Sequence, residues 1–258
     1  MALSLLQRNQ LDYALRIGGY HNECEVEGEW VAADATFAPG RCFLAYSHAG
    51  ASQVIVATSL PHVARAFAEE GHAPHSGVAL PAGAISTFLI EAPDLHAAVR
   101  RLFELSRSLP SAPLDRFLEK SRSLPKTTDA ERLVVQRIGQ DIFREALIDF
   151  WSGRCAVTGL DQPELLRASH MKPWKDCTSD AQRLDPFNGL LLAVHWDTVF
   201  DCGLVTFADD GAVQLSGKLS ERARSLLLRA PSSPPRISGL RARHMPFLQH
   251  HRARIWRP

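Results

Sequence analysis

The sequence lacks the features that mark several classes of protein. Its 258 residues include 5 cysteines at scattered positions, with no Cys-x-x-Cys pair, so neither a disulfide framework nor a four-cysteine zinc site is expected. No apolar run approaches the length of a membrane span. The N-terminal residues show neither the basic start nor the long apolar core of a signal peptide. We therefore expect a cytoplasmic protein with no membrane partner.

Acidic side chains are missing from the C-terminal end of the chain. After Glu221 there is none, whereas nine arginines follow. The formal net charge is only +1, because residues 1–120 hold 9 basic and 13 acidic side chains (−4) and residues 121–258 hold 20 and 15 (+5). An arginine-rich tail indicates a polyanion partner, since neutralised phosphates release counterions. A solvated, poorly ordered terminus explains the same charges equally well.

Residues 1–105 have the pattern of a small mixed α/β domain. Strands are predicted at 41–47, 52–60 and 83–91, and helices at 61–71 and 92–108. The acidic stretch 24–30 fits either an edge strand or a loop. A regulator that senses a small molecule through this domain is a third possible function. No glycine-rich phosphate loop follows any of these strands, so it has no motif to support it.

A linker is predicted over residues 106–128, where prolines interrupt the chain and the pentamer Ser-Arg-Ser-Leu-Pro occurs twice. One or two helical turns are expected within it, around Leu114–Leu118. A long helix follows at about 129–151. A short strand and turn are predicted at 155–160, and further strands at 164–170 and 189–194. Helices are predicted at 195–202 and 220–230, and a hairpin on an Asp-Gly turn at 203–216. The whole chain is thus expected to be α+β, with a second domain over 129–258.

Polar side chains surround the second and third of these strands. His170 ends one strand, Asn188 follows 18 residues later, and His195 and Asp197 lie 7 and 9 residues after the asparagine. We expect this strand–loop–strand–helix to bring His170 to face the groups at the helix start. A neutral imidazole can deprotonate water, and a divalent cation can stabilise the developing charge. The pattern therefore suits hydrolysis of phosphodiesters.

Several strings in this region resemble those of one known family. RCAVTGL, LLRASHMKPWKD, RLDPFNGLLLAVHWDTVFDCGLVTF and DDG occur in order and are similar to HNH endonucleases, which have the ββα-metal nuclease fold. The resemblance covers roughly residues 130–258 and is strongest to a restriction-endonuclease-like branch with a separate N-terminal domain. It implies metal-dependent hydrolysis of DNA that leaves 5′-phosphate and 3′-hydroxyl ends, with Mg²⁺ or Mn²⁺ as cofactor.

The same resemblance assigns roles to individual residues. His170 matches the general base, and Asn188 matches the central asparagine that organises the loop. Asp197 stands where the motif has its final histidine, and His195 lies two residues earlier, so both are candidate metal ligands. Ser169 stands where many relatives carry an Asp or His ligand. Structural zinc is not expected.

Candidate DNA contacts are basic side chains, although ordinary surface charge is the alternative for each. They are Lys172, Arg144, Arg252 and Arg254. The neighbouring His250 and His251 form another potential metal site, in a tail that looks flexible. Asp201 is expected to hydrogen-bond within the turn before Gly203, and metal ligation is the alternative for this carboxylate.

Two functions follow from these patterns. The first is a DNA endonuclease of restriction or defence, whose N-terminal domain selects the target or mediates dimerisation; a homodimer would supply the two sites that a double-strand break needs. The second is a DNA-binding module that has lost catalysis, because Ser169 and Asp197 depart from the motif.

Overall fold

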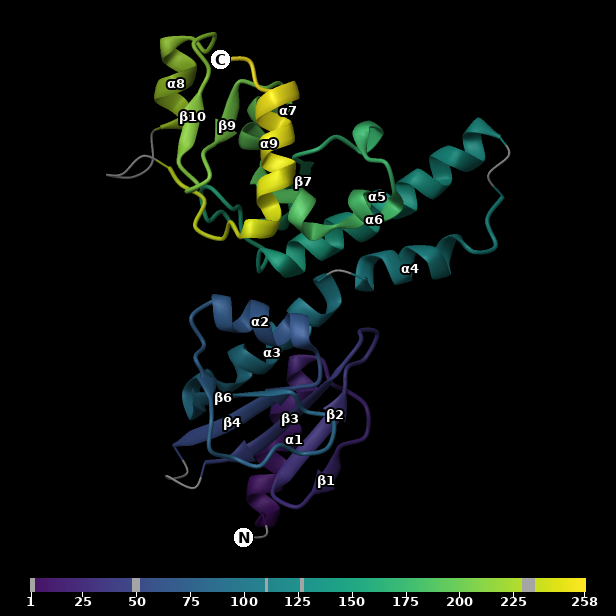
Figure 1. Ribbon diagram of the computed structural model, residues 1–258, viewed down its shortest axis with the longest axis vertical. Coiled ribbons are helices and arrows are strands. Elements are labelled where there is room, and N and C mark those ends of the chain that lie inside the picture. Colours follow the sequence, from purple (N-terminus) through teal and green to yellow (C-terminus); the bar gives the residue numbers. More distant parts are fainter. Residues whose placement is uncertain (1–2, 48–51, 110, 126–127, 229–234) are drawn as a thin grey trace. The chain divides into compact units, whose positions relative to one another are not determined.

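The chain forms two compact units, Met1–Ala112 and Pro113–Pro258, drawn in sequence colours in Figure 1. The computed structural model describes residues 3–47, 52–109, 111–125, 128–228 and 235–258. Within these residues, no helix combines the length and the apolar character needed to cross a membrane.

The N-terminal unit is built on one antiparallel sheet of six strands. The strand order is β1-β2-β3-β4-β6-β5. Its elements are α1 (Leu5–Gly18), β1 (Glu25–Glu27), β2 (Trp30–Asp34), β3 (Arg41–Tyr46), β4 (Gln53–Thr58), α2 (Pro61–Glu69), β5 (Pro74–His75), β6 (Ser86–Glu91) and α3 (Leu95–Ser108). Helix α1 was not predicted from the sequence; it begins with a capping box between Ser4 and Gln7.

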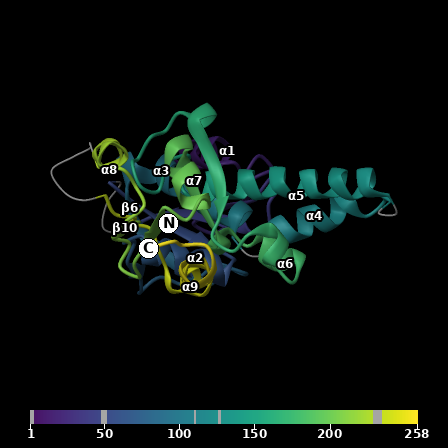
Figure 2. The ribbon, with the colours of Figure 1, turned by 90° about the horizontal axis from the view of Figure 1, so that it is seen from above.

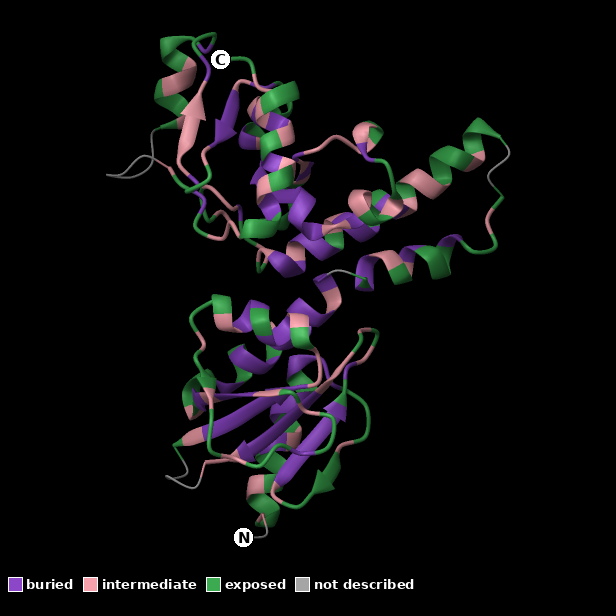
Figure 3. Ribbon diagram, viewed as in Figure 1, coloured by how far each residue is buried: buried purple, intermediate pink, exposed green. Residues whose placement is uncertain are grey.

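Both faces of the central strands are covered. Strands β2, β3 and β4 are almost entirely buried, whereas β1 is exposed, as Figure 3 shows. Helices α1 and α3 pack on each other and on the sheet. The opposite face carries an apolar cluster against which Val78 and Ala84 of the β5–β6 loop pack.

Most of the segment predicted as a linker, residues 106–128, is helical. Helix α3 extends to Ser108, and α4 spans Ala112–Ser121. Figure 1 and Figure 2 both show α4 running alongside the long helix α5 (Asp129–Phe150). Phe117 is buried in the core of the C-terminal unit, and Arg116 pairs with Glu145 of α5. The helical turns predicted around Leu114–Leu118 are therefore part of a longer amphipathic helix that packs on the core, where a linker was expected.

The C-terminal unit continues from α5 through short strands and helices. They are β7 (Leu166–His170), α6 (Asp180–Leu184), β8 (Gly189–Ala193), α7 (Val194–Asp201), β9 (Val205–Phe207), β10 (Val213–Leu215), α8 (Glu221–Leu227) and α9 (Met245–Arg254). Short 3-10 turns occur at Pro163–Leu165, Trp174–Asp176, Pro186–Asn188 and Ala242–His244.

Two sequence expectations for this unit are wrong. Residues 155–160 form a turn, not a strand, because Gly159 adopts a φ of +71° and Leu160 closes the turn by accepting from the Cys155 amide. The tail is also not a loose terminus: α9 buries Leu248 and His251. Residues 229–234 of the tail, including Arg229, lie outside the described part.

Candidate functional site

A two-stranded hairpin and the helix after it form the centre of the site. Strands β7 and β8 pair antiparallel, with His170 opposite Gly189 and Ser169 opposite Leu190. Helix α7 follows β8 directly and contacts both strands, and α5 also contacts both. Because neighbouring residues of a strand point to opposite faces, the hairpin presents one set of side chains to α7 and another to α5.

The imidazole of His170 lies on the α5 face. It stacks on Phe143, with ring centroids 3.8 Å apart and an interplanar angle of 14°, and meets the edge of Trp174. Its Nε2 lies 2.8 Å from the carbonyl oxygen of Arg183. A carbonyl can only accept, so Nε2 carries the proton and Nδ1 keeps a lone pair. Burial lowers the pKa of His170 to about 4, against the opposing effect of the Arg183 carbonyl. The ring is therefore neutral at pH 7.

Gly189 makes the stacking of His170 possible. A Cβ atom at this position would lie 2.6 Å from both Cζ of Phe143 and Cδ1 of Leu147. Only glycine lets α5 approach the hairpin this closely. Gly189, which lies opposite His170 in the ladder, therefore determines where Phe143 lies.

Asn188 organises the loop between the two strands. Its side chain is fully buried. Its Oδ1 accepts from the Lys172 amide at 2.8 Å, while Nδ2 donates to the carbonyl oxygens of Lys172 and Gln182, both at 3.1 Å. Gln182 precedes Arg183, whose carbonyl holds His170. The amide thus fixes the backbone that orients the imidazole, which is the role expected from the sequence.

The α7 face of the hairpin is acidic. The Ser169 hydroxyl donates to Oδ1 of Asp197, and Asp201 lies one helical turn further along α7. Partial burial of its carboxyl, together with the charge of Asp197, raises the pKa of Asp201 to about 6. The carboxylates of Asp197 and Asp201 therefore lie close enough on this face that the charge of Asp197 opposes ionisation of Asp201.

The recorded contacts of His170 are with Phe143, Trp174 and the Arg183 carbonyl, and none joins it to Asp197 among the described residues, so its expected convergence with the start of α7 stays a prediction. Ser169 takes the α7 side of β7, and the next residue must then take the α5 side. His195 and Asp197 also separate, as two residues two positions apart on a helix do. Asp197 meets Ser169, whereas His195 is exposed and its ring lies beside that of Trp196.

The donors on the α7 face fit a hydrated hard cation. In the described part of the chain, no three His, Cys, Asp or Glu side chains come together as a metal cage. Mg²⁺ is commonly held by one or two carboxylates with water in its remaining positions. Asp197, Asp201 and the Ser169 hydroxyl supply oxygen donors of that kind, and they lack the nitrogen and sulfur ligands that favour zinc.

Three of the four basic candidates hold the fold together. Lys172 Nζ donates to Gln182 at 3.1 Å. Arg144 donates from α5 to the carbonyl oxygens of Leu166 and Pro163, at 2.7 and 2.9 Å.

Arg252 is engaged in the same way, donating to the Phe207 carbonyl at 2.8 Å and to Asp209 at 2.6 Å. Arg254 is exposed, and no partner for it is recorded among the described residues. The two C-terminal histidines also part: His250 faces Asp176 at 3.3 Å, and His251 is buried against Phe200.

Sequence reasoning missed two parts of the site. The Arg183 carbonyl is a backbone atom, so no residue pattern reveals it. Phe143 belongs to the apolar stripe of α5, which indicates only a core residue. The Arg183 side chain stiffens the same loop, since it donates to the carbonyl oxygens of Trp174 and Cys177 at 3.3 and 2.9 Å.

Comparison with known families gives one match. Residues 155–208 match the sequence profile of the HNH endonuclease family. No curated protein matches the chain significantly. The matched segment contains the β7–β8 hairpin, Asn188 and α7, but it reaches neither the N-terminal unit nor α5 and α9. The match supports the HNH resemblance, and the segment that carries the candidate site is similar to an HNH endonuclease domain.

Proposed function

We propose that the C-terminal unit is a metal-dependent endonuclease that hydrolyses phosphodiester bonds of DNA. The observation that carries this proposal is the state of His170: a neutral imidazole, held in one tautomer by a backbone carbonyl, next in the chain to a hydroxyl–carboxylate pair. The family match of residues 155–208 supports the same chemistry.

His170 acts as the general base in this proposal. Its Nδ1 removes a proton from a water molecule, whose oxygen forms a bond to phosphorus while the bond from phosphorus to the 3′ oxygen breaks. The Arg183 carbonyl stabilises the imidazolium that results, because it already accepts from Nε2. Asn188 keeps that carbonyl in place. The departing 3′ oxygen takes a proton from solvent water, and the imidazolium returns its proton to solvent, so the products carry 5′-phosphate and 3′-hydroxyl ends.

Asp197 and Asp201 hold the cation in this proposal, with Ser169 orienting Asp197. A bound Mg²⁺ or Mn²⁺ supplies stabilisation of the charge that develops on the phosphate oxygens. Asp197 takes this role rather than His195, because the Asp197 carboxylate accepts a hydrogen bond from Ser169 of the hairpin. The elevated pKa of Asp201 supports the assignment, since a cation between the two carboxylates would relieve their repulsion.

The test is cleavage of supercoiled plasmid by the purified chain in EDTA, Mg²⁺ or Mn²⁺. We expect cutting that requires metal, falls at least about 100-fold in His170→Ala, and falls comparably in Asp197→Asn. His195→Ala is the matched control, because it removes a histidine from α7 that touches neither set of groups. Full activity of His170→Ala would reject the assignment of the base.

A DNA-binding module without catalysis is the second candidate. Two observations favour it: the hydroxyl of Ser169 already occupies one oxygen of Asp197, and the His170 ring stacks on Phe143 of α5 with a pKa lowered to about 4 by burial. Such a module would retard the plasmid in a gel shift without cutting it in any metal. A shift that His170→Ala leaves unchanged, with no cleavage by the wild type, would select this function.

A restriction or defence role is the finer part of the proposal, with the N-terminal unit selecting the target. Cleavage of plasmids with and without base modification tests it. A preference for one plasmid would support target selection, and linear rather than nicked product would indicate two sites acting together, as in a homodimer.

A further inference from the structure

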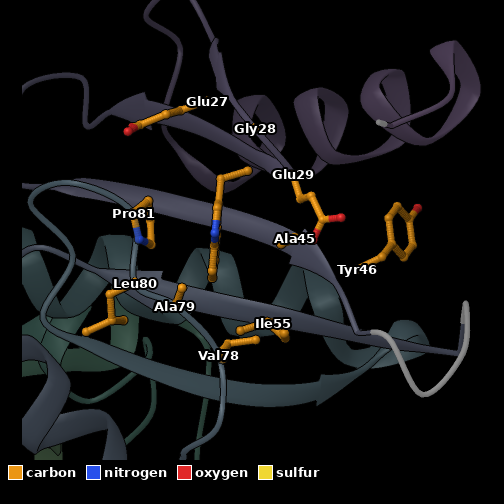
Figure 4. A pocket seen from close by; sticks show the side chains of 11 residues that line it. Glu27, Gly28, Glu29, Ala45, Tyr46, Ile55, Val78, Ala79, Leu80 and Pro81 are labelled. Carbon is orange, nitrogen blue, oxygen red and sulfur yellow. The ribbon is translucent and has the colours of Figure 1, made fainter. Parts of the chain in front are cut away.

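A hollow opens on the sheet face of the N-terminal unit that the β5–β6 loop covers. Its volume is about 310 Å³, at the small end of ligand pockets. Figure 4 shows Glu27, Gly28 and Glu29 of the β1–β2 turn on one side and Val78, Ala79 and Leu80 on the other. The remaining lining residues are Trp30, Ala45, Tyr46, Ile55 and Pro81.

Small side chains create this hollow. Ala45 pairs with Ile55 on β4, and Trp30 precedes Val31, which pairs with Leu44. Trp30, Ala45 and Ile55 therefore form one row across three strands. The single methyl group of Ala45 leaves space between two large neighbours. The loop closes over the row through Val78 and does not fill it.

The charge of the hollow is entirely negative. Among the lining residues that the structure describes, Glu27 and Glu29 carry a charge, and none is a lysine or an arginine. Strand pairing places Glu27 opposite Trp30, on the same face of the sheet. The nearby Arg41 pairs with Glu25 and Asp34, which leaves it directed to other carboxylates.

We propose that this hollow binds an organic cation: an ammonium or guanidinium group carried on a compact apolar body. The Trp30 indole offers a π face, which attracts cations, and the two glutamates complement the charge. Ile55, Val78 and Leu80 accommodate the apolar part. Either a free amine or a basic side chain of a peptide has this chemistry. The inference concerns the N-terminal unit and is independent of the proposed nuclease.

The test uses the full chain labelled with ¹⁵N, in which each of the five tryptophans gives one indole N–H resonance. The resonance of Trp30 is assigned by its loss in Trp30→Phe. Benzyltrimethylammonium is the cationic probe, and benzyl alcohol and benzoate are its neutral and anionic counterparts. A Gly-Arg-Gly peptide with blocked ends tests the second source. We expect the cation to shift the Trp30 resonance and benzoate to leave it unchanged.

Two variants separate charge from shape. Glu27→Gln combined with Glu29→Gln should weaken the cation at least 10-fold, whereas Asp94→Asn, which removes a charge elsewhere in the unit, should not. Ala45→Leu should fill the hollow and abolish the shift while the other resonances stay in place. Equal binding of all three probes, unchanged binding in the double variant, or no shift with either cation would overturn the proposal. If Ala45→Leu does not fold, the double variant decides.

Discussion

At the residue scale, the candidate base is positioned by atoms that do not react. The stacking partner Phe143 and the Arg183 carbonyl together set the orientation and tautomer of His170. The position opposite in the ladder must be glycine for this to happen. A side chain at Gly189 would therefore displace Phe143 and, with it, the ring on which His170 stacks.

Gly189→Ala tests this link. The added methyl group overlaps Phe143 and Leu147, so we expect a loss of about 1–3 kcal/mol of unfolding free energy. Chemical denaturation measures it. Gly217→Ala is the matched control, because nothing lies within 4 Å of its added Cβ, and it should change stability by less than about 0.5 kcal/mol. Equal costs at the two positions would contradict the packing argument.

Asn188→Ala tests the loop. It removes one acceptor and the donors to two carbonyl groups, and we expect a loss of about 2–4 kcal/mol because buried polar groups are left without partners. Plasmid cleavage should also fall in the variant under conditions where circular dichroism shows it folded. Asn22→Ala, at an exposed asparagine, controls for the substitution itself. Wild-type activity in folded Asn188→Ala would remove this residue from the site.

At the element scale, α9 is a structural part of the C-terminal unit. His251 contacts Thr206 of β9 and the Phe200 carbonyl of α7 through its two ring nitrogens, at 3.0 and 3.1 Å. Arg252 binds the end of β9. The helix thus joins α7 to the β9–β10 hairpin. At least one of its basic residues, Arg252, makes structural contacts within the unit.

Shortening the Leu248 side chain to alanine measures how much α9 contributes to the stability of the C-terminal unit. Leu248 is fully buried, so Leu248→Ala should cost about 2–5 kcal/mol. Gln249→Ala, at the exposed neighbouring position, should be nearly neutral. A thermal unfolding series on the two variants gives the comparison. A neutral Leu248→Ala would mean that the helix is not part of the core, as the charge pattern of the tail suggested.

At the scale of the whole molecule, buried histidines connect stability to pH. Burial lowers the pKa values of His244 and His251 to about 4, below the value of about 6.5 expected in the unfolded chain. Between these values the unfolded chain binds protons that the folded chain does not. Stability should therefore fall as the pH drops from about 6.5 toward 4, and this term should be constant above 6.5.

Urea unfolding at pH 7, 6 and 5 measures this effect. Each histidine contributes at most about 1.4 kcal/mol per pH unit within the window. His251→Gln should be less stable at pH 7 but should show a shallower pH dependence, by about one proton. An unchanged slope would show that His251 does not titrate in this way. Carboxyl groups in general titrate at lower pH, which is why the series stops at 5. Asp201, whose pKa is raised to about 6, titrates within the series with the opposite sign, but it is present in both wild type and His251→Gln, so the difference between the two slopes reports His251.

The sequence by itself determined the local parts of this protein. The period of the apolar residues predicted α5 and β8, and the strings around His170 and Asn188 predicted a hairpin followed by a short helix, which the structure contains. These features depend on neighbours in the chain, so they are visible in a pattern. The loop role of Asn188 also followed from its resemblance to the motif.

Only the tertiary structure decided which face each group takes and what it touches. A shift of one residue along a strand reverses its face, so the pattern could not separate His170 from Ser169. Likewise, charge could not show that Arg144 and Arg252 bind backbone carbonyls, or that α4 and α9 pack on the core. Those contacts join residues far apart in the chain, and several use backbone atoms that every residue carries. Their geometry exists only once the chain has folded.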